Sequence, residues 1–502
     1  MSQSFNTATH GRNTMPHMNA VLTPTSAPSA PSATTPSTPP SPARSTHAPG
    51  PVSRWWGLPL LREMKRDYLG FVTKLQRNHG DISYMRLGNE HAWDLMSPDL
   101  VREALVTHAD ALIRWERGIE VFAQVFGQSV LVTEGATWQR QRRMLMAAFT
   151  PKQVAGYAEL MTAAAQEAFD KLVAEGQSHA LVTMDALWNR VAMDVILRTM
   201  FSRSAQQDSL AAIGATQTLS ATAFREMFRL FTLPDWLPLP GKAAKRKALR
   251  NLRQLIQGHI TERQAAIAEQ PDQANQQDLL GRLLALRDEA TGTGLSDQEV
   301  FDQCMVSFQA GHETSATALL WWSRLMAEHP EVAQRARDEV RAVVGSGTPG
   351  PQHMAQLPWL TATLKEAMRL YPPVAAIMSR RTTAPIMVDG WHIPKGAMLR
   401  ITPWVLHHDG RWFDQPHAFR PQRFMDGAPP IPKGAWMPFG AGPRVCLGQH
   451  FAMVEMTLLS AMLLQRFTLE LPAGAAACTP ELHVTLRPKQ SVQLRLSRIV
   501  AP

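Results

Sequence analysis

Cysteine is scarce in this chain of 502 residues, which contains Cys304, Cys446 and Cys478 and no others. So small and odd a number argues against a disulfide framework and indicates a reducing compartment. It also excludes an iron–sulfur domain in this chain, because such a cluster normally needs four thiolates.

Acidic residues are missing from the first 52 positions, which hold ten prolines and two arginines among many Ser, Thr and Ala residues. A segment of this composition buries too little apolar surface to order itself, so residues 1–53 are predicted to be a disordered tail. The tail lacks the apolar stretch of a secretory signal or membrane anchor, and its prolines fit a transit peptide poorly.

Long hydrophobic runs are also missing, since no 18 apolar residues follow one another anywhere. We therefore expect no transmembrane segment and a soluble, cytoplasmic protein, with organellar import or peripheral membrane contact as the alternatives. The net charge of +9 fits solubility and a basic tail, or a face that docks an acidic partner. No nucleic-acid-binding motif is present, which argues against a nucleic-acid partner.

Helical periodicity dominates from residue 54 onward, and no linker divides the chain. Helices are predicted over 154–175, 184–201, 243–270 and 359–371, and a long one from a capping box at Ser296 to about His329. Short strands are predicted at 387–388, 391–393 and 398–402, and a last pair at 483–486 and 492–496. The fold class is therefore mainly α with a small β portion, in a single domain over residues 54–502.

Cys446 lies in the segment FGAGPRVCLG, which runs from Phe439 to Gly448. The glycines allow the backbone to fold tightly round the sulfur, so that main-chain N–H groups point at it. A helix predicted to start at Cys446 adds a positive dipole end, which favours an ionised thiol. A buried, inert cysteine is the alternative, and the glycines and Arg444 around it argue against that reading.

This segment resembles the haem-binding loop of the cytochrome P450 family, F-x-x-G-x-R-x-C-x-G, at every fixed position. The resemblance extends from about Arg54 to the end of the chain. It implies a P450-like α+β fold with haem b between the long central helix and the helix after Cys446. In this fold Cys446 is the iron ligand, and Phe439, Arg444 and Gly448 contact the haem.

The long helix contains the sequence AGHET, which starts at Ala310. Gly311 is unfavourable within a helix, and Thr314 can bond back to a carbonyl one turn earlier, so a local opening of the helix is predicted. The family has A/G-G-x-D/E-T at this place above the haem. The resemblance implies that Ala310 contacts haem, that Thr314 hydrogen-bonds the bound dioxygen, and that Glu313 relays protons.

Glu366 and Arg369 lie three residues apart on a predicted helix face and can pair. The segment from Phe419 to Phe424 resembles the family's P-E-R-F segment. By that resemblance Glu366, Arg369 and Arg423 form a buried structural trio beneath the haem loop. Gln422 replaces the usual glutamate of the segment and leaves the trio intact.

Haem carries two propionates, which arginine binds well because of its forked donors. Trp138 and Arg142 resemble the family's W-x-x-x-R, and with Arg444 they are expected to bind the propionates. Arg380 lies thirteen residues before Ile393 at the spacing of another propionate-binding residue, and its neighbour Arg381 is the rival.

The resemblance implies a monooxygenase that activates dioxygen and hydroxylates or epoxidises a lipophilic small molecule. With no flavin domain or iron–sulfur cluster in the chain, electrons come from a separate ferredoxin or flavodoxin with its reductase, and basic residues near the haem loop are candidates for docking it. A peroxygenase that uses hydrogen peroxide and a non-catalytic haem sensor are the alternatives, and the Glu313–Thr314 pair favours dioxygen over peroxide. The docking candidates are Arg140, Arg143 and Lys433, and the predicted substrate pocket is Ile119, Phe122, Val125, Phe308, Val374, Ala375 and Ile377.

Overall fold

The computed structural model describes residues 48–174, 181–204, 209–228, 235–237, 239–269 and 278–499. Most of the predicted tail, residues 1–47, therefore lies outside the described residues. Residues 48–53 do not belong to the tail, because they lie against strand β1 (Ile82–Leu87). Tyr84 donates its backbone N–H to the Pro49 carbonyl at 2.9 Å, and Arg86 donates its own to Ser53 Oγ at 2.9 Å. The described fold thus begins before the predicted boundary at residue 54.

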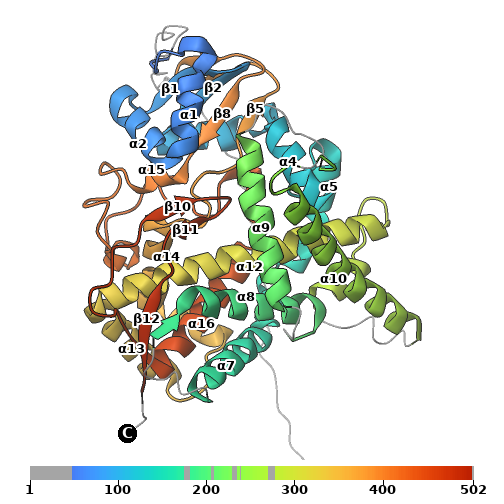
Figure 1. The fold of residues 1–502 in the computed structure, drawn as a ribbon, viewed down its shortest axis with the longest axis vertical. Helices are drawn as coiled ribbons and strands as arrows, with labels where there is room; N and C mark the ends of the chain where they lie inside the picture. The colour runs from blue at the N-terminus through green and yellow to red at the C-terminus, as the bar shows by residue number, and fades with distance from the viewer. Residues whose placement is uncertain are drawn as a thin grey trace, which may run out of the picture. The chain divides into compact units, whose positions relative to one another are not determined.

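Helices make up most of the described fold, as the periodicity predicted (Figure 1). The predicted helix over 184–201 is α8, while the one over 154–175 is two helices, α6 and α7, because the chain turns at Gly156. The α-helices are α1 (Leu58–Arg66), α2 (Tyr68–His79), α3 (Pro98–Arg102), α4 (Glu116–Phe126), α5 (Gly135–Ala148), α6 (Pro151–Ala155), α7 (Ala158–Ala174), α8 (Met184–Phe201), α9 (Ser209–Met227), α10 (Lys242–Glu269), α11 (Leu279–Ala285), α12 (Asp297–Glu328), α13 (Pro330–Val344), α14 (Pro358–Leu370), α15 (Pro403–His407) and α16 (Gln449–Arg466).

The 32-residue helix α12 is the central element, drawn in yellow in Figure 1. The predicted capping box starts it, since Glu299 N–H donates to Ser296 Oγ at 3.2 Å and Ser296 N–H donates to Glu299 Oε2 at 3.0 Å. Helices α4, α8, α10, α14 and α16 all contact it. Most of its length is buried, and this is why it carries apolar residues on nearly every face.

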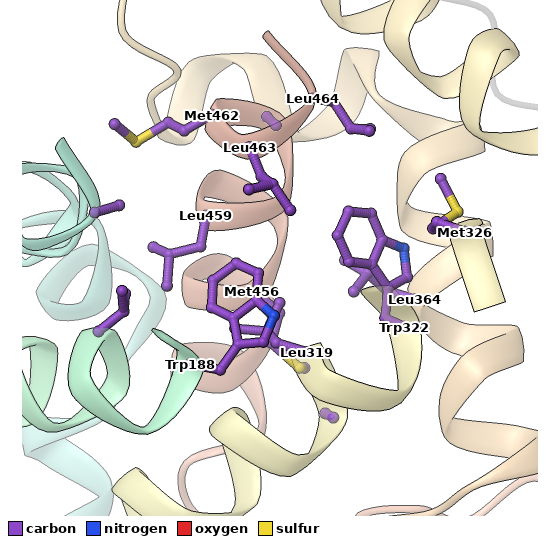
Figure 2. Close-up of a cluster of buried hydrophobic side chains, with 14 of the residues drawn as sticks. Trp188, Leu319, Trp322, Met326, Leu364, Met456, Leu459, Met462, Leu463 and Leu464 are labelled. Atoms are coloured by element: carbon purple, nitrogen blue, oxygen red, sulfur yellow. The ribbon is translucent and has the colours of Figure 1, made fainter. Parts of the chain in front are cut away.

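The largest apolar core lies between α12, α16, α14 and α8 (Figure 2). Its three buried indoles have polar partners: Trp188 Nε1 donates to Ser323 Oγ at 2.8 Å, Trp322 Nε1 donates to Thr363 Oγ1 at 2.9 Å, and Trp359 Nε1 donates to the Val332 carbonyl at 3.3 Å. A buried indole N–H without a partner would cost free energy, so these bonds select one arrangement of the helices. The leucines and methionines labelled in Figure 2 come from α12, α14 and α16 and belong to the same cluster.

A five-stranded sheet in the order β1-β2-β8-β5-β3 lies beside the helices. Its pairing makes Arg114, at the end of β3, the cross-strand partner of Arg380, at the start of β5. The strands predicted at 387–388 and 391–393 are β6 and β7, which pair as a hairpin, and the two turn residues, Asp389 and Gly390, both have positive φ angles. The strands of the chain up to this hairpin and β8 are β1 (Ile82–Leu87), β2 (Glu90–Leu95), β3 (Leu112–Arg114), β4 (Leu181–Thr183), β5 (Arg380–Thr382), β6 (Ile386–Val388), β7 (Trp391–Ile393) and β8 (Met398–Ile401).

The predicted C-terminal strand pair is wrong. Strand β11 (Leu486–Pro488) pairs with β10 (Pro480–Leu482), whereas β12 (Gln493–Arg498) pairs with β4 and with β9 (Phe467–Glu470). The two strands bury their leucines in different places: β12 contributes to the main core, and β11 packs Leu486 in a small cluster with Leu69 and Ala375. Residues 483–485 are the tip of the β10–β11 hairpin rather than a strand.

The helix after the cysteine starts three residues later than predicted. Gly448 is the N-cap of α16, whose first residue is Gln449. Cys446 instead closes a loop, because its backbone N–H donates to the Phe439 carbonyl at 3.0 Å. The sulfur therefore precedes the helix and lies before its N-terminal end.

Candidate active site

A cavity of about 1280 Å³ collects most of the predicted site residues on its wall. Its wall is formed by α4, α5, α9, α12 and the start of α16, together with the segments 373–380 and 438–448 and the tip of the β10–β11 hairpin. Cys446 and Thr314 are far apart in the sequence, and both line this cavity. The predicted residues on this wall are Trp138, Arg142, Ala310, Glu313, Thr314, Arg380, Phe439, Arg444, Cys446 and Gly448.

Cys446 faces the cavity from a loop that only glycine permits. At Gly442, with φ of 71°, a Cβ atom would lie 2.1 Å from the Leu105 carbonyl oxygen. Burial raises the pKa of the Cys446 thiol, while a hydrogen bond from the Gly448 N–H and the charge of Arg142 act to lower it. The backbone amide predicted to point at the sulfur is therefore present. The Cys446 side chain is accessible on the cavity wall, so a cation bound there can reach an ionised sulfur.

Three arginines converge on the wall round a single carboxylate. Glu134 forms an ion pair with Arg114 at 3.3 Å and another with Arg444. Arg380 acts on the same carboxylate through its charge and is itself only 8% exposed. The charge of the nearby Arg142 acts on Cys446 instead. The other three cations and one anion leave a largely buried surplus of two positive charges, the charge that two haem propionates neutralise.

The choice between Arg380 and Arg381 follows from the alternation of the strand. Arg380 lies on the cavity wall, whereas Arg381 points away and forms ion pairs with Glu90 at 2.6 Å and Glu116 at 2.8 Å. Burial lowers the pKa of Arg380 to about 10 and that of Arg444 to about 10. A bound anion would favour the charged form of Arg380 and Arg444 and so raise both pKa values. Arg381 already has two carboxylate partners.

Trp138 and Arg142 project from α5 toward the same cluster. The Arg444 guanidinium lies 3.7 Å from the centre of the Trp138 ring, within the range of a cation–π contact. The Arg142 guanidinium is 5.9 Å from the same ring. Sequence reasoning missed Arg114 and Glu134, since each belongs to no motif and is brought to the site by long-range pairing.

Helix α12 presents Glu313 and Thr314 at the cavity. Thr314 Oγ1 donates to the Ala310 carbonyl at 2.7 Å, which is the back-bond expected from the sequence. The helix is nevertheless continuous through Gly311, so the predicted local opening is not seen. A Cβ atom on Gly311 would lie 2.8 Å from Ile196 Cδ1, and close packing of α8 on α12 explains the glycine.

The Oε1 atom of Glu313 has three partners from other parts of the chain. Ser220 of α9 donates to it at 2.9 Å, Thr485 of the β10–β11 tip donates at 2.6 Å, and Arg487 of β11 forms an ion pair at 2.6 Å. Glu313 is buried, while the Arg487 side chain is 24% exposed. The ion pair thus links a buried acid on the cavity wall with the protein surface.

The predicted structural trio is present and fully buried at its centre. Arg369 donates to both oxygens of Glu366, at 2.7 Å and 2.8 Å, and Arg423 donates to Glu366 Oε1 at 3.2 Å. Arg369 also donates to the carbonyl oxygens of His407 and Pro416, each at 2.7 Å. The pair therefore fastens α14 to the segment that precedes the cysteine loop.

Of the seven residues predicted for the substrate pocket, four lie on the cavity wall and three do not. Ile119, Phe308 and Ala375 are not on the wall, because Phe308 packs into the core near α8 and α10 and Ala375 packs against Leu69. Helix α9 was overlooked, although it contributes five residues, since its small and apolar side chains look like an ordinary core face. The confirmed wall residues are Phe122, Val125, Val374 and Ile377, and those of α9 are Leu219, Ser220, Ala223, Phe224 and Met227.

Two of the three basic docking candidates already have partners. Arg140 is ion-paired with Glu299, and Arg143 is ion-paired with the buried Asp288 at 2.6 Å. Lys433 is exposed. These pairs reduce the charge that Arg140 and Arg143 offer to an acidic partner.

A buried acid on α16 gives a testable pH dependence. Ser315, on the cavity wall, donates to Glu455 Oε2 at 2.6 Å, and burial raises the pKa of Glu455 from 4.5 to about 8. The folded state therefore binds this proton more tightly than the unfolded state, and the free energy of unfolding falls as pH rises from about 4.5 to about 8. We expect Glu455→Gln to flatten this decline and to be more stable than the unaltered protein at the alkaline end.

Urea unfolding across this pH range measures the effect, and Glu481→Gln, at an exposed position, is the control. Each pKa unit corresponds to about 1.4 kcal/mol, so the difference is well within reach of the measurement. Equal slopes in Glu455→Gln and the unaltered protein would show that Glu455 is ionised in the folded state.

The comparisons with known proteins agree with this geometry. The cytochrome P450 family model matches residues 47–496, and the chain belongs to the cytochrome P450 family. Among its relatives are two from Streptomyces melanosporofaciens: a cyclooctatin synthase, 30% identical over 89% of this chain and 98% of its own length, and a cyclooctat-9-en-7-ol 5-monooxygenase, 30% identical over 84% of this chain and 89% of its own. A cytokinin hydroxylase of Arabidopsis thaliana is 30% identical over 84% of this chain and 81% of its own length.

Family membership confirms the predicted fold class and the activity, so the protein is an oxygen-incorporating oxidoreductase, a monooxygenase of small molecules. It also implies a haem-iron cofactor. Among the described residues no cluster of three or more His, Cys, Asp and Glu side chains could hold a metal ion. No α-helix in the described ranges is both long and apolar enough to span a bilayer.

Proposed function

We propose that the protein binds haem b through the Cys446 thiolate and hydroxylates or epoxidises a bulky lipophile with dioxygen. One observation carries the proposal: a single cavity wall holds Cys446, the Glu313–Thr314 pair and a cluster of arginines with two surplus positive charges. The apolar lining of the cavity supports a lipophilic substrate, and the names of the two Streptomyces relatives support a cyclic one.

When bound, haem supplies the redox-active iron that activates dioxygen, while the protein supplies orientation, charge and protons. Arg114, Arg380 and Arg444 would hold the propionates, with Trp138 stacked beneath Arg444. Cys446 would donate its sulfur from the loop closed by Phe439, and Gly448 N–H would stabilise the thiolate. Phe439 and Ala310 complete the wall round the cofactor.

The acid and the alcohol on α12 would carry protons to the cavity. Arg487 connects the Glu313 carboxylate with the surface, so Glu313 can exchange protons with solvent when this ion pair opens. Thr314 Oγ1 lies on the wall in the next residue, and its hydroxyl, which donates to the Ala310 carbonyl, can donate into the cavity when it turns away from that carbonyl. Phe122, Val125, Val374 and Ile377 would exclude water from the substrate.

Electrons would come from a separate ferredoxin or flavodoxin with its reductase, because the sequence holds no dinucleotide-binding fingerprint and too few cysteines for a cluster. We also propose a cytoplasmic location. The three cysteines of the chain support it, since Cys304, Cys446 and Cys478 are all free thiols.

Thr314→Ala tests the dioxygen route. We expect product formed per electron consumed to fall about tenfold or more, because an alanine carries no hydroxyl to deliver a proton. The assay follows oxidation of a panel of lipophiles with a surrogate ferredoxin system and, separately, with hydrogen peroxide alone. Thr317→Ala is the control, at a buried threonine of the same helix that is not on the cavity wall.

Activity with peroxide alone that survives Thr314→Ala would replace the monooxygenase route by a peroxygenase. Haem binding without oxidation under either condition would make the protein a sensor. Both outcomes would overturn the proposal, whereas electron-dependent oxidation that Thr314→Ala uncouples supports it.

A further inference from the structure

A second hollow, bordered by three arginines, lies between α10 and α4 and shares no wall residue with the main cavity. Its volume is about 370 Å³. The arginines are 246, 250 and 253 of α10, which share one face of the helix because residues three and four apart lie one above the other. The other wall residues are Gln124 of α4, Asp235 and Leu249. Arg250 and Arg253 are exposed, so the hollow is open to solvent.

The charges of these three arginines are not balanced by ion pairs. Arg246 donates to the Asp235 carbonyl and Arg253 donates to the Gln124 carbonyl at 3.2 Å, but in the part of the chain that the structure describes none of the three pairs with a carboxylate. The helix itself supplies no acid, since residues 242–261 contain neither Asp nor Glu. Like charges three and four apart destabilise a helix, so this face calls for an anion.

The one carboxylate on the wall is already neutralised. Asp235 forms ion pairs with Lys242 at 2.5 Å and with Lys245 at 3.1 Å. The same two lysines pair with the buried Glu226, at 2.7 Å and 2.9 Å. Two lysines thus balance two carboxylates, and the arginines remain as a surplus beside them.

One more carboxylate lies within reach of this charge. Asp302, a buried residue of α12, feels the charge of Arg253, although the two form no ion pair in the described structure. Even with Asp302 counted against one arginine, two positive charges are left over. A basic run on a helix is commonly a solvated face, and Lys247, which is exposed and not on the wall, fits that description. The three arginines differ from it because they border a concave site.

We propose that this hollow binds a small anion that carries a diphosphate group. The forked donors of arginine bind phosphate oxygens in pairs, and a diphosphate offers two neighbouring phosphates to match the two surplus charges. The helix rise sets Arg246 and Arg253 about 10 Å apart along the axis, with Arg250 between them, so the arginines can reach both phosphates at once. The inference does not depend on the proposed function, because the site is separate from the haem cavity.

Calorimetric titration of the haem-loaded protein with inorganic diphosphate tests the proposal, at a fixed ionic strength of about 0.15 M so that general screening is constant. We expect one saturable site per chain. Arg250→Gln should raise the dissociation constant about tenfold or more, which corresponds to about 1.4 kcal/mol, because one forked cation is lost. Arg250→Lys keeps the charge without the fork and should give an intermediate value.

Lys247→Gln is the matched control, because it removes the same charge from an exposed position of the same helix away from the wall. Its dissociation constant should stay within twofold of that of the unaltered protein. Citrate, a tricarboxylate, is the second probe and should bind at least tenfold more weakly than diphosphate. Absence of saturable diphosphate binding, an equal loss in Lys247→Gln and Arg250→Gln, or citrate binding as tight as that of diphosphate would each overturn the inference.

Discussion

Cys446→Ser is expected to abolish the red-shifted Soret band that a thiolate-ligated ferrous haem gives with carbon monoxide. A serine hydroxyl does not ionise near neutral pH and donates far less electron density to iron than a thiolate does. The loop offers no substitute, because Cys304 is buried in another core cluster and Cys478 is not on the cavity wall. Loss of the band should be accompanied by loss of electron-dependent oxidation.

Cys304→Ser and Cys478→Ser are the matched controls, because they make the same chemical change away from the cavity. Both are expected to retain the band in the folded protein. A Cys446→Ser protein that binds haem and keeps the red-shifted band would show that another residue provides the ligand.

Arg369→Met is expected to have the largest effect on stability. It removes the main partner of Glu366, and both side chains are 0% exposed. The buried carboxylate would keep Arg423 as its one ion-pair partner and the Arg420 N–H as a further donor. Breaking a buried ion pair in this way costs roughly 3–5 kcal/mol, a large share of the stability of most domains. We expect a marked fall in the urea midpoint and poor haem incorporation, since the trio fastens the segment before the cysteine loop.

The double variant Glu366→Leu with Arg369→Met should recover part of this loss, because no unpaired charge is then buried. Arg420→Met, which breaks an ion pair with the exposed Asp414, is the control and should change stability by about 1 kcal/mol or less. Equal stability of Arg369→Met and the unaltered protein would mean that the trio contributes nothing to the fold.

Local signals predicted the parts of the structure that depend on neighbours in sequence. The capping box at Ser296 marked the start of α12, and the local pattern marked the two short strands at 387–388 and 391–393. The spacing round Cys446 predicted the loop because its glycines act on the backbone within a few residues. The start of α16 was misplaced, since the bond between Cys446 and Phe439 that delays the helix does not show in helical periodicity.

Features that depend on long-range pairing could not be read from the sequence. Glu134 and Arg114 meet Arg444 only because β3 pairs with β5 and α5 starts beside them. The alternation of β5 decides between Arg380 and Arg381, and it is known only once the register is known. Phe308 was placed in the pocket by family position, whereas its neighbour Gln309 faces the cavity.

The bond between Cys446 and iron is the central claim, and X-ray absorption at the iron edge of the purified, haem-loaded protein tests it most directly. The predicted result is one sulfur atom in the iron coordination sphere of the unaltered protein, of Cys304→Ser and of Cys478→Ser, and none in Cys446→Ser. A coordination sphere of nitrogen and oxygen alone in the unaltered protein would contradict the account.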